Sequence, residues 1–234
     1  MIDLKRASFL VLVIVLLGLK SNSQEFIYHR GLATLTMGVA IPAYDFGSGS
    51  GINLSSHVKM GTNITAEVSY FTNFHVGMNF MITYSINPIN TDELADAYLL
   101  ESPAFVTTSA EARPFRDLAG LGGMVLDIPV FDRVSMSFKM MGGLRSIYKP
   151  TSVVKTTTVF SGIDYYETHS NNVVFALLFS GGARFYINDY FNLHFNASYM
   201  GSTLNLEYFR NNKAINQKTH IGVLTMNAGV SYSF

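Results

Sequence analysis

His220-Ile-Gly-Val-Leu-Thr-Met-Asn-Ala-Gly-Val-Ser-Tyr-Ser-Phe234 is the stretch of sequence that decides the fold. From Leu224 onward its even positions carry apolar or aromatic residues, whereas its odd positions from Thr225 to Ser233 carry only small or polar ones. This period of two is typical of a strand with lipid on one side and a polar lumen on the other. We therefore predict that this stretch is a strand of a transmembrane β-barrel.

The first 23 residues have the pattern of a secretory signal peptide. Lys5 and Arg6 supply positive charge, residues 7–19 are apolar, and Ser21-Asn22-Ser23 provides the small residues that a signal peptidase reads. The apolar run of 13 residues is too short to span a bilayer, although a retained anchor helix is the alternative. We predict cleavage before Gln24, so that residues 24–234 form the mature barrel domain.

Composition excludes several classes of function. Cleavage would remove three of the 16 basic residues and one of the 16 acidic residues, which leaves a net charge of −2. A nearly neutral chain lacks the basic stripe that nucleic-acid binding requires. The sequence contains no Cys, which excludes a lipoprotein anchor, disulfides and thiolate metal sites.

Seven further segments alternate with the same period of two and are predicted to be strands. Three of the connections between them are only three residues long, at 71–73, 131–133 and 188–190, and they alternate with long ones. Short periplasmic turns and long extracellular loops follow this rule in outer-membrane barrels. We predict an all-β, eight-stranded antiparallel up-and-down transmembrane barrel; a soluble barrel with an apolar interior is the alternative. The seven segments are about 31–42, 58–70, 74–86, 118–130, 134–148, 173–187 and from 191 onward.

Two long connections carry structure of their own. In 87–118, Asn90 and Glu93 resemble a helix cap before residues 94–100, which predicts a short helix; an irregular loop is the alternative. In 149–172, β-prone stretches flank Ser161-Gly162 and predict a hairpin that continues two barrel strands above the membrane. Near Gly201 the apolar positions change phase, which predicts a β-bulge.

The whole mature chain resembles the small Gram-negative outer-membrane β-barrel family, often called outer membrane β-barrel domain proteins. The terminal Phe234 and the segment Gly38-Val-Ala-Ile-Pro-Ala-Tyr-Asp-Phe-Gly47 are similar to features of such chains. The resemblance implies residence in the cell outer membrane, contact with lipids and lipopolysaccharide, and insertion by the barrel-assembly machinery, with Tyr232 and Phe234 as the insertion signal. A PorT-type, secretion-associated branch exists in this family, and no residue here selects it.

The sequence does not place a catalytic constellation at the outer rim. Barrel enzymes such as lipid A-modifying enzymes need a Ser or His with a carboxylate close together. The rim candidates are Ser202, Glu207, His220 and His169, and if Tyr208 pairs with His220, Ser202 is about 20 Å away along the strand. No metal-ligand spacing occurs either. We predict a non-enzymatic protein without cofactor or metal.

Charged residues on inward positions form the candidate site. An eight-stranded interior is only wide enough for side chains to fill it, so buried charges are expected to pair. We predict that Arg184 bridges Glu67 and Asp127, that Arg184 faces His194, and that the network closes the lumen; the alternative is unconnected charges in a polar lumen. The predicted network comprises Glu67, His75, Asp127, Lys139, Arg145, Arg184 and His194.

The leading functional hypothesis is a structural or interaction barrel that meets a protein or surface-polymer partner through its extracellular loops. Val159, Phe160, Tyr165 and Tyr166 make the hairpin a β-prone, aromatic edge, which is the kind of edge that accepts a strand from another chain. The alternative for these side chains is that they line the lipopolysaccharide layer. Alternative functions are a narrow channel or small-ligand carrier, a lipid A-modifying enzyme, or a PorT-type protein.

Overall fold

The computed structural model describes residues 30–44, 46–48, 54–73, 75–101, 105–158, 162–167, 170–210 and 213–234. The predicted signal peptide lies outside these residues, as do Val159, Phe160 and His169. Among the described residues, no helix is long and apolar enough to cross a membrane.

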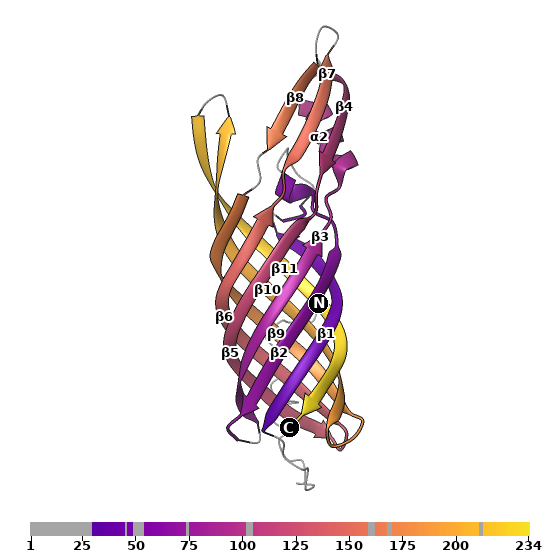
Figure 1. Ribbon diagram of the computed structural model, residues 1–234, viewed down its shortest axis with the longest axis vertical. Helices are drawn as coiled ribbons and strands as arrows, with labels where there is room; N and C mark the ends of the chain where they lie inside the picture. The colour runs from indigo at the N-terminus through magenta and orange to yellow at the C-terminus, as the bar shows by residue number, and fades with distance from the viewer. Residues whose placement is uncertain are drawn as a thin grey trace, which may run out of the picture.

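Eight antiparallel strands close into a barrel, as predicted (Figure 1). Around the barrel the order is β1-β11-β10-β9-β6-β5-β3-β2, so the first and last strands of the chain pair with each other. Closure leaves no unpaired edge at the level of the barrel wall. The strands are β1 (Gly31–Tyr44), β2 (Gly61–Phe71), β3 (Val76–Asn87), β5 (Phe115–Phe131), β6 (Val134–Lys149), β9 (Ser170–Tyr186), β10 (Phe191–Arg210) and β11 (Lys213–Ser233).

A second, three-stranded sheet stands above one end of the barrel, in the order β4-β7-β8 (Figure 1). It consists of β4 (Phe105–Ala112), β7 (Ser152–Thr158) and β8 (Gly162–Glu167). The predicted hairpin is present as β7 and β8, but it does not simply prolong two barrel strands: β4, which the sequence placed in a loop, pairs with β7. The predicted helix is present as α2 (Thr91–Glu101), and a 3-10 helix, η1 (Leu54–His57), precedes β2.

The tight turns all lie at the opposite end, together with the C-terminus (Figure 1). β2 and β3 are joined by residues 72–75, β5 and β6 by residues 132–133, and β9 and β10 by residues 187–190. Asn73 and Asn188 each accept hydrogen bonds from backbone N–H groups two and three residues further on. These Asx-type bonds satisfy the backbone where the chain reverses.

The bulge predicted near Gly201 is wrong. β10 and β11 pair in unbroken register from Phe191 opposite Tyr232 to Arg210 opposite Lys213. The pairing of β10 with β9 ends at Ser202, and beyond it β10 and β11 form a two-stranded ribbon. The apolar phase changes there because the strands leave the barrel wall, so lumen and lipid no longer dictate which face is apolar.

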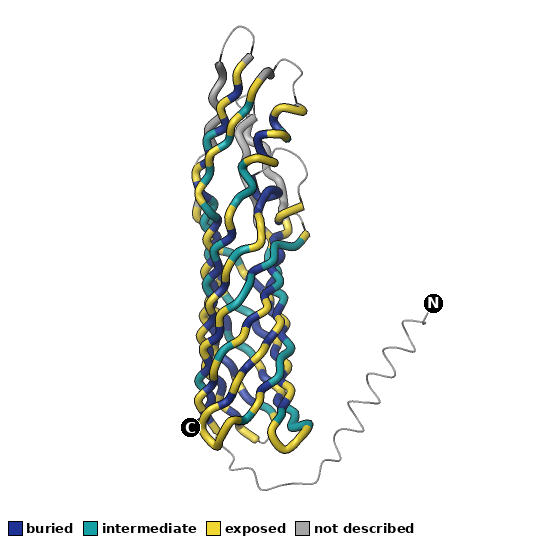
Figure 2. The backbone as a smooth tube through the Cα atoms, turned by 90° about the vertical axis from the view of Figure 1, so that its right-hand side faces the viewer, coloured by how far each residue is buried: buried dark blue, intermediate teal, exposed yellow. Residues whose placement is uncertain are grey.

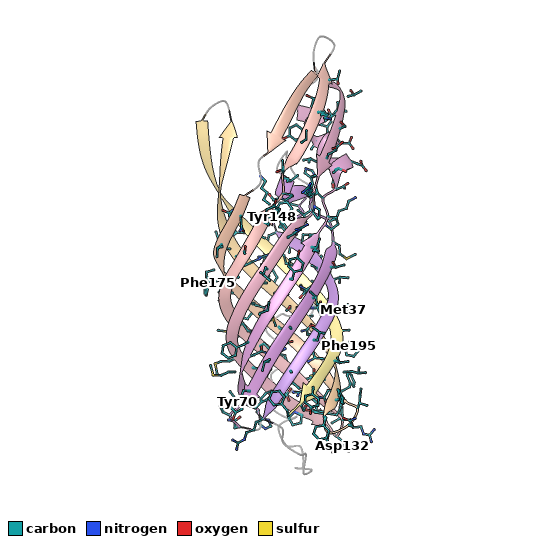
Figure 3. The ribbon with its side chains drawn as sticks, viewed as in Figure 1. Met37, Tyr70, Asp132, Tyr148, Phe175 and Phe195 are labelled. Atoms are coloured by element: carbon teal, nitrogen blue, oxygen red, sulfur yellow. The ribbon has the colours of Figure 1, made fainter. Side chains whose placement is uncertain are left out.

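Where the structure describes side-chain burial in the barrel wall, buried residues alternate with more exposed ones along the strands (Figure 2). Large apolar side chains such as Met37 (67% exposed) and Phe175 (63%) point away from the barrel, whereas Asn79 inside is fully buried (Figure 3). A soluble barrel would have the reverse arrangement. The alternative of a soluble barrel with an apolar interior is therefore contradicted.

Candidate functional site: the closed lumen and the outer sheet

A buried ion pair crosses the lumen near the turn end. Lys139 Nζ on β6 lies 2.5 Å from Glu67 Oε2 on β2, and both side chains are almost completely buried. Asn79 on β3 donates to the same carboxylate oxygen at 2.8 Å. A buried charge needs a partner and further hydrogen bonds. Lys139 and Asn79 provide these for Glu67 Oε2, whereas Glu67 Oε1 has no partner among the described residues.

A second pair lies closer to the turns, between Arg184 on β9 and Asp127 on β5. The Arg184 guanidinium also lies 5.9 Å from the Phe71 ring centre and 5.4 Å from that of Tyr186. As predicted, Arg184 is opposite His194. Arg184 does not bridge two carboxylates, however, because Lys139 is the partner of Glu67.

His75 does not belong to this network. It lies in the turn between β2 and β3 and is exposed. β3 begins at Val76, two residues later than predicted, so His75 lies outside the alternation that would have turned it inward. Its backbone carbonyl accepts a hydrogen bond from the Asp127 N–H, which fixes the start of β3 against β5.

Arg145 forms a separate pair towards the other end of the barrel. Its guanidinium contacts both carboxylate oxygens of Asp117 at 2.6 to 3.0 Å and donates to Ser202 Oγ and to the Ile221 carbonyl. Arg145 is only 1% exposed. The sequence reading missed Asp117 because it began this strand at residue 118, whereas β5 begins at Phe115.

An apolar layer lies between the Glu67–Lys139 pair and the Arg145–Asp117 pair. This layer was not predicted from the sequence. It comes from the inner faces of β3, β5, β6, β9 and β10. Consecutive apolar residues signal such positions, because in a strand one member of each doublet must face inward; Met140-Met141 and Leu177-Leu178 are examples. The layer comprises Met81, Ala119, Leu121, Met141, Ala176, Leu178 and Met200.

Uncharged polar side chains cover the inner surface formed by β2, β3 and β11. Asn63 donates to the Thr83 and Ser85 hydroxyls, and its carbonyl accepts from Thr65 and from Asn227 Nδ2. These bonds tie β2, β3 and β11 together across the inner surface. These hydrogen bonds satisfy both the amide and the carbonyl group of Asn63, and the lumen is filled here without charge.

The end of the lumen opposite the turns is covered by a cap. Leu54 of η1, Leu94 and Tyr98 of α2, and Val154 of β7 are buried in one apolar cluster with inward residues of the barrel strands. Those barrel residues include Phe115, Ile147 and Ile221. From the turn end to the opposite end, the lumen is therefore filled by the Arg184–Asp127 and Glu67–Lys139 pairs, the apolar layer, the Arg145–Asp117 pair and the cap.

The rim candidates for catalysis are arranged differently from the sequence-based expectation. His220 is opposite Thr203, not Tyr208, so it lies next to Ser202 along the sheet instead of about 20 Å away. Adjacent strand residues point to opposite faces: Ser202 accepts from Arg145 inside, whereas His220 contacts Thr203 on the exposed side at 3.1 Å. They do not form a nucleophile and base pair. The side chains of Glu207 and His169 lie outside the part of the chain that the structure describes.

Among the described residues, β8 of the predicted hairpin is hydrogen-bonded to a neighbouring strand on one side only, that of β7. β4 occupies the outer edge of β7, so β8 is the end strand of this sheet. Tyr165 and Tyr166 lie on β8, opposite Val154 and Val153 of β7, although their side chains are not described.

At the turn end, the Tyr232 ring stacks between those of Tyr190 and Phe234 on the exterior.

No protein-family model matches the chain, and no curated protein matches it significantly. Solved structures with a similar fold include Ail, the attachment invasion locus protein of Yersinia pestis (14% identity, TM-score 0.41, covering 88% of this chain and 99% of Ail). Neisserial surface protein A is similar at 12% identity and a TM-score of 0.47, with coverages of 87% and 97%. The protease OmpT from Escherichia coli is similar at 9% identity and a TM-score of 0.35, with coverages of 92% and 99%. Identities and TM-scores this low carry no information about what the chain does.

Proposed function

We propose that this chain is a non-enzymatic barrel of the bacterial outer membrane that holds a partner-binding sheet above the membrane and conducts no solute. The observation that carries the proposal is the combination of an apolar exterior, a filled lumen and a small sheet at one end. A barrel whose inside is packed has only its ends and its outer surface with which to act. The structured sheet and its cap make the end opposite the turns the functional one.

The apolar exterior supports membrane residence. Contiguous apolar surface of this extent is not stable in water, and the aromatic residues at the turn end match the girdle that such barrels place at an interface. By the same rule the turns face the periplasm and the outer sheet faces outward. Recovery of the full chain in the outer-membrane fraction, with gel mobility that changes on heating, is the expected result. Recovery as a soluble periplasmic protein contradicts the proposal.

The partner we propose is an extended segment of another protein chain that adds a strand to β8. End strands present unpaired N–H and C=O groups, and strand addition uses these for affinity. The segment Gly162-Ile-Asp-Tyr-Tyr-Glu167 contains no Pro that would block such pairing. The aromatic residues Tyr165 and Tyr166 would supply side-chain contacts to the added strand.

Two adjacent proline variants test this edge. Successive N–H groups of a strand point to opposite edges, so one of Tyr165→Pro and Tyr166→Pro removes an N–H from the open edge and the other removes one from the β7 side. Partners captured from the outer surface by the full chain should be lost with the open-edge variant. A variant lacking 151–168 should lose them as well. Identical partner sets for the wild type and the deletion would refute the assignment of the sheet as the binding element.

A further inference from the structure

The part of the lumen between the apolar layer and the turns is lined by polar side chains. They come from five strands, β2, β3, β6, β9 and β10, and include both members of the Glu67–Lys139 pair. Further from the turns, at Met81, Met141, Leu178 and Met200, the inner faces of β3, β6, β9 and β10 turn apolar. The polar residues on these strands are Asn79 on β3, Ser137 and Lys139 on β6, Ser180 on β9, and His194 and Asn196 on β10, all buried.

Several of these buried groups direct polar atoms into the lumen that no other described residue satisfies. They include carboxylate and amide oxygens, two hydroxyl groups and one imidazole nitrogen. A buried polar atom left unsatisfied keeps the full cost of its desolvation, so a set of this size is incompatible with a stable, dry interior. The atoms are Glu67 Oε1, Asn79 Oδ1, Ser137 Oγ, Ser180 Oγ, Asn196 Oδ1 and His194 Nε2.

One cavity lies at the barrel wall beside Glu67. Its lining combines inward residues with lipid-facing ones such as Val68, Phe80 and Tyr232. The inward residues are Thr34, Glu67, Met81, Leu121, Gly143 and Ser231, and of these Glu67 carries one of the unsatisfied atoms.

The turn end of this region is closed by the Arg184–Asp127 pair. The guanidinium lies near the rings of Phe71 and Tyr186, and Phe71 packs in a small apolar cluster with Leu32 and Val125. The Asp127 side chain is 11% exposed, against 1% for that of Glu67. The pair therefore lies at the boundary between solvent and the polar region.

We infer that the turn-end part of the lumen is a hydrated chamber, a site for water and uncharged polar solutes of similar size, and that Arg184 gates it. Most of the unsatisfied atoms are acceptors, and water supplies donors while fitting a small polar space. The apolar layer ends the chamber, so solutes enter and leave at the turns without crossing the barrel. This chamber is independent of what the outer sheet binds.

Because the natural chain contains no Cys, single-cysteine variants test the chamber without background. Ser180→Cys places a thiol in the chamber. Leu178→Cys, two residues earlier in β9, places a thiol in the apolar layer, and Asp189→Cys places one in an exposed turn. The full folded chain is treated with methyl methanethiosulfonate, a small neutral reagent, and labelling is followed by mass spectrometry. Each variant is compared with and without Arg184→Ala.

With Arg184 present, Ser180→Cys should label more slowly than Asp189→Cys and faster than Leu178→Cys. Arg184→Ala should accelerate the labelling of Ser180→Cys about tenfold or more, because the local opening it requires becomes easier, and should leave Leu178→Cys unchanged. Phe71→Ala is a second gate variant should Arg184→Ala fail to fold, as judged by unheated gel mobility. No acceleration of Ser180→Cys overturns the gate. If, in the Arg184→Ala background, the thiol of Ser180→Cys is labelled no faster than that of Leu178→Cys, the inference of a chamber is overturned.

Discussion

Removing the ammonium group of the buried Glu67–Lys139 pair is the sharpest test of how the lumen is held together. In Lys139→Met the Glu67 carboxylate keeps its bond from Asn79 but loses the only cation within 4 Å among the described residues. The carboxylate side chain is 1% exposed, so bulk solvent does not surround it, and water in the lumen supplies no counter-charge for the lost ammonium group. Stranding a buried charge costs about 3–5 kcal/mol.

That cost translates into a measurable shift. With a denaturant slope of about 2 kcal/mol per molar urea, Lys139→Met should lower the unfolding midpoint by about 1.5–2.5 M. The chain contains no Trp, so the folded fraction is best followed by unheated gel mobility in detergent or lipid. The matched control is the double variant Glu67→Gln with Lys139→Met, which removes both charges of this pair and retains an amide for Asn79.

The double variant should recover most of the lost stability, to within about 1.5 kcal/mol of wild type, because replacing both members of a buried pair is often nearly neutral. The reasoning is refuted by an unchanged midpoint for Lys139→Met. It is equally refuted by a double variant that is no more stable than Lys139→Met alone, since the loss would then come from packing rather than from the stranded charge.

Three further outcomes follow from the same structure. Arg184→Ala should lower the urea midpoint because it strands Asp127, and a midpoint equal to that of wild type would contradict the pairing. Wild-type protein in planar bilayers should show no steady single-channel conductance, since the cap and the apolar layer fill the lumen; a steady conductance would refute closure. Gly123→Ala should destabilise the barrel by about 1–3 kcal/mol, because its Cβ would meet the Met140 carbonyl oxygen at 2.1 Å, whereas Gly120→Ala has nothing within 4 Å and should be tolerated in the same unfolding assay.

The sequence determined the barrel, the number of strands in its wall and most of the residues that face inward, His75 being an exception. These features are local: alternation within one strand separates lipid from lumen, and the length of a turn decides which strands are antiparallel neighbours. The register next to a tight turn was equally accessible, as Arg184 opposite His194 shows. Far from a tight turn the register could not be predicted from the sequence. The residue opposite His220 was misplaced by five positions, at Tyr208 instead of Thr203.

Only the tertiary structure decided which inward residues meet. Strands in a closed barrel are tilted and staggered, so residues equally far from their turns do not lie at the same height in the lumen. For that reason Glu67 pairs with Lys139 from three strands away. The pairing of β4 with β7 is also a tertiary feature, because β4 is distant in sequence from that hairpin. Alternation reveals the face on which a side chain lies, whereas the stagger of the closed sheet decides its partner.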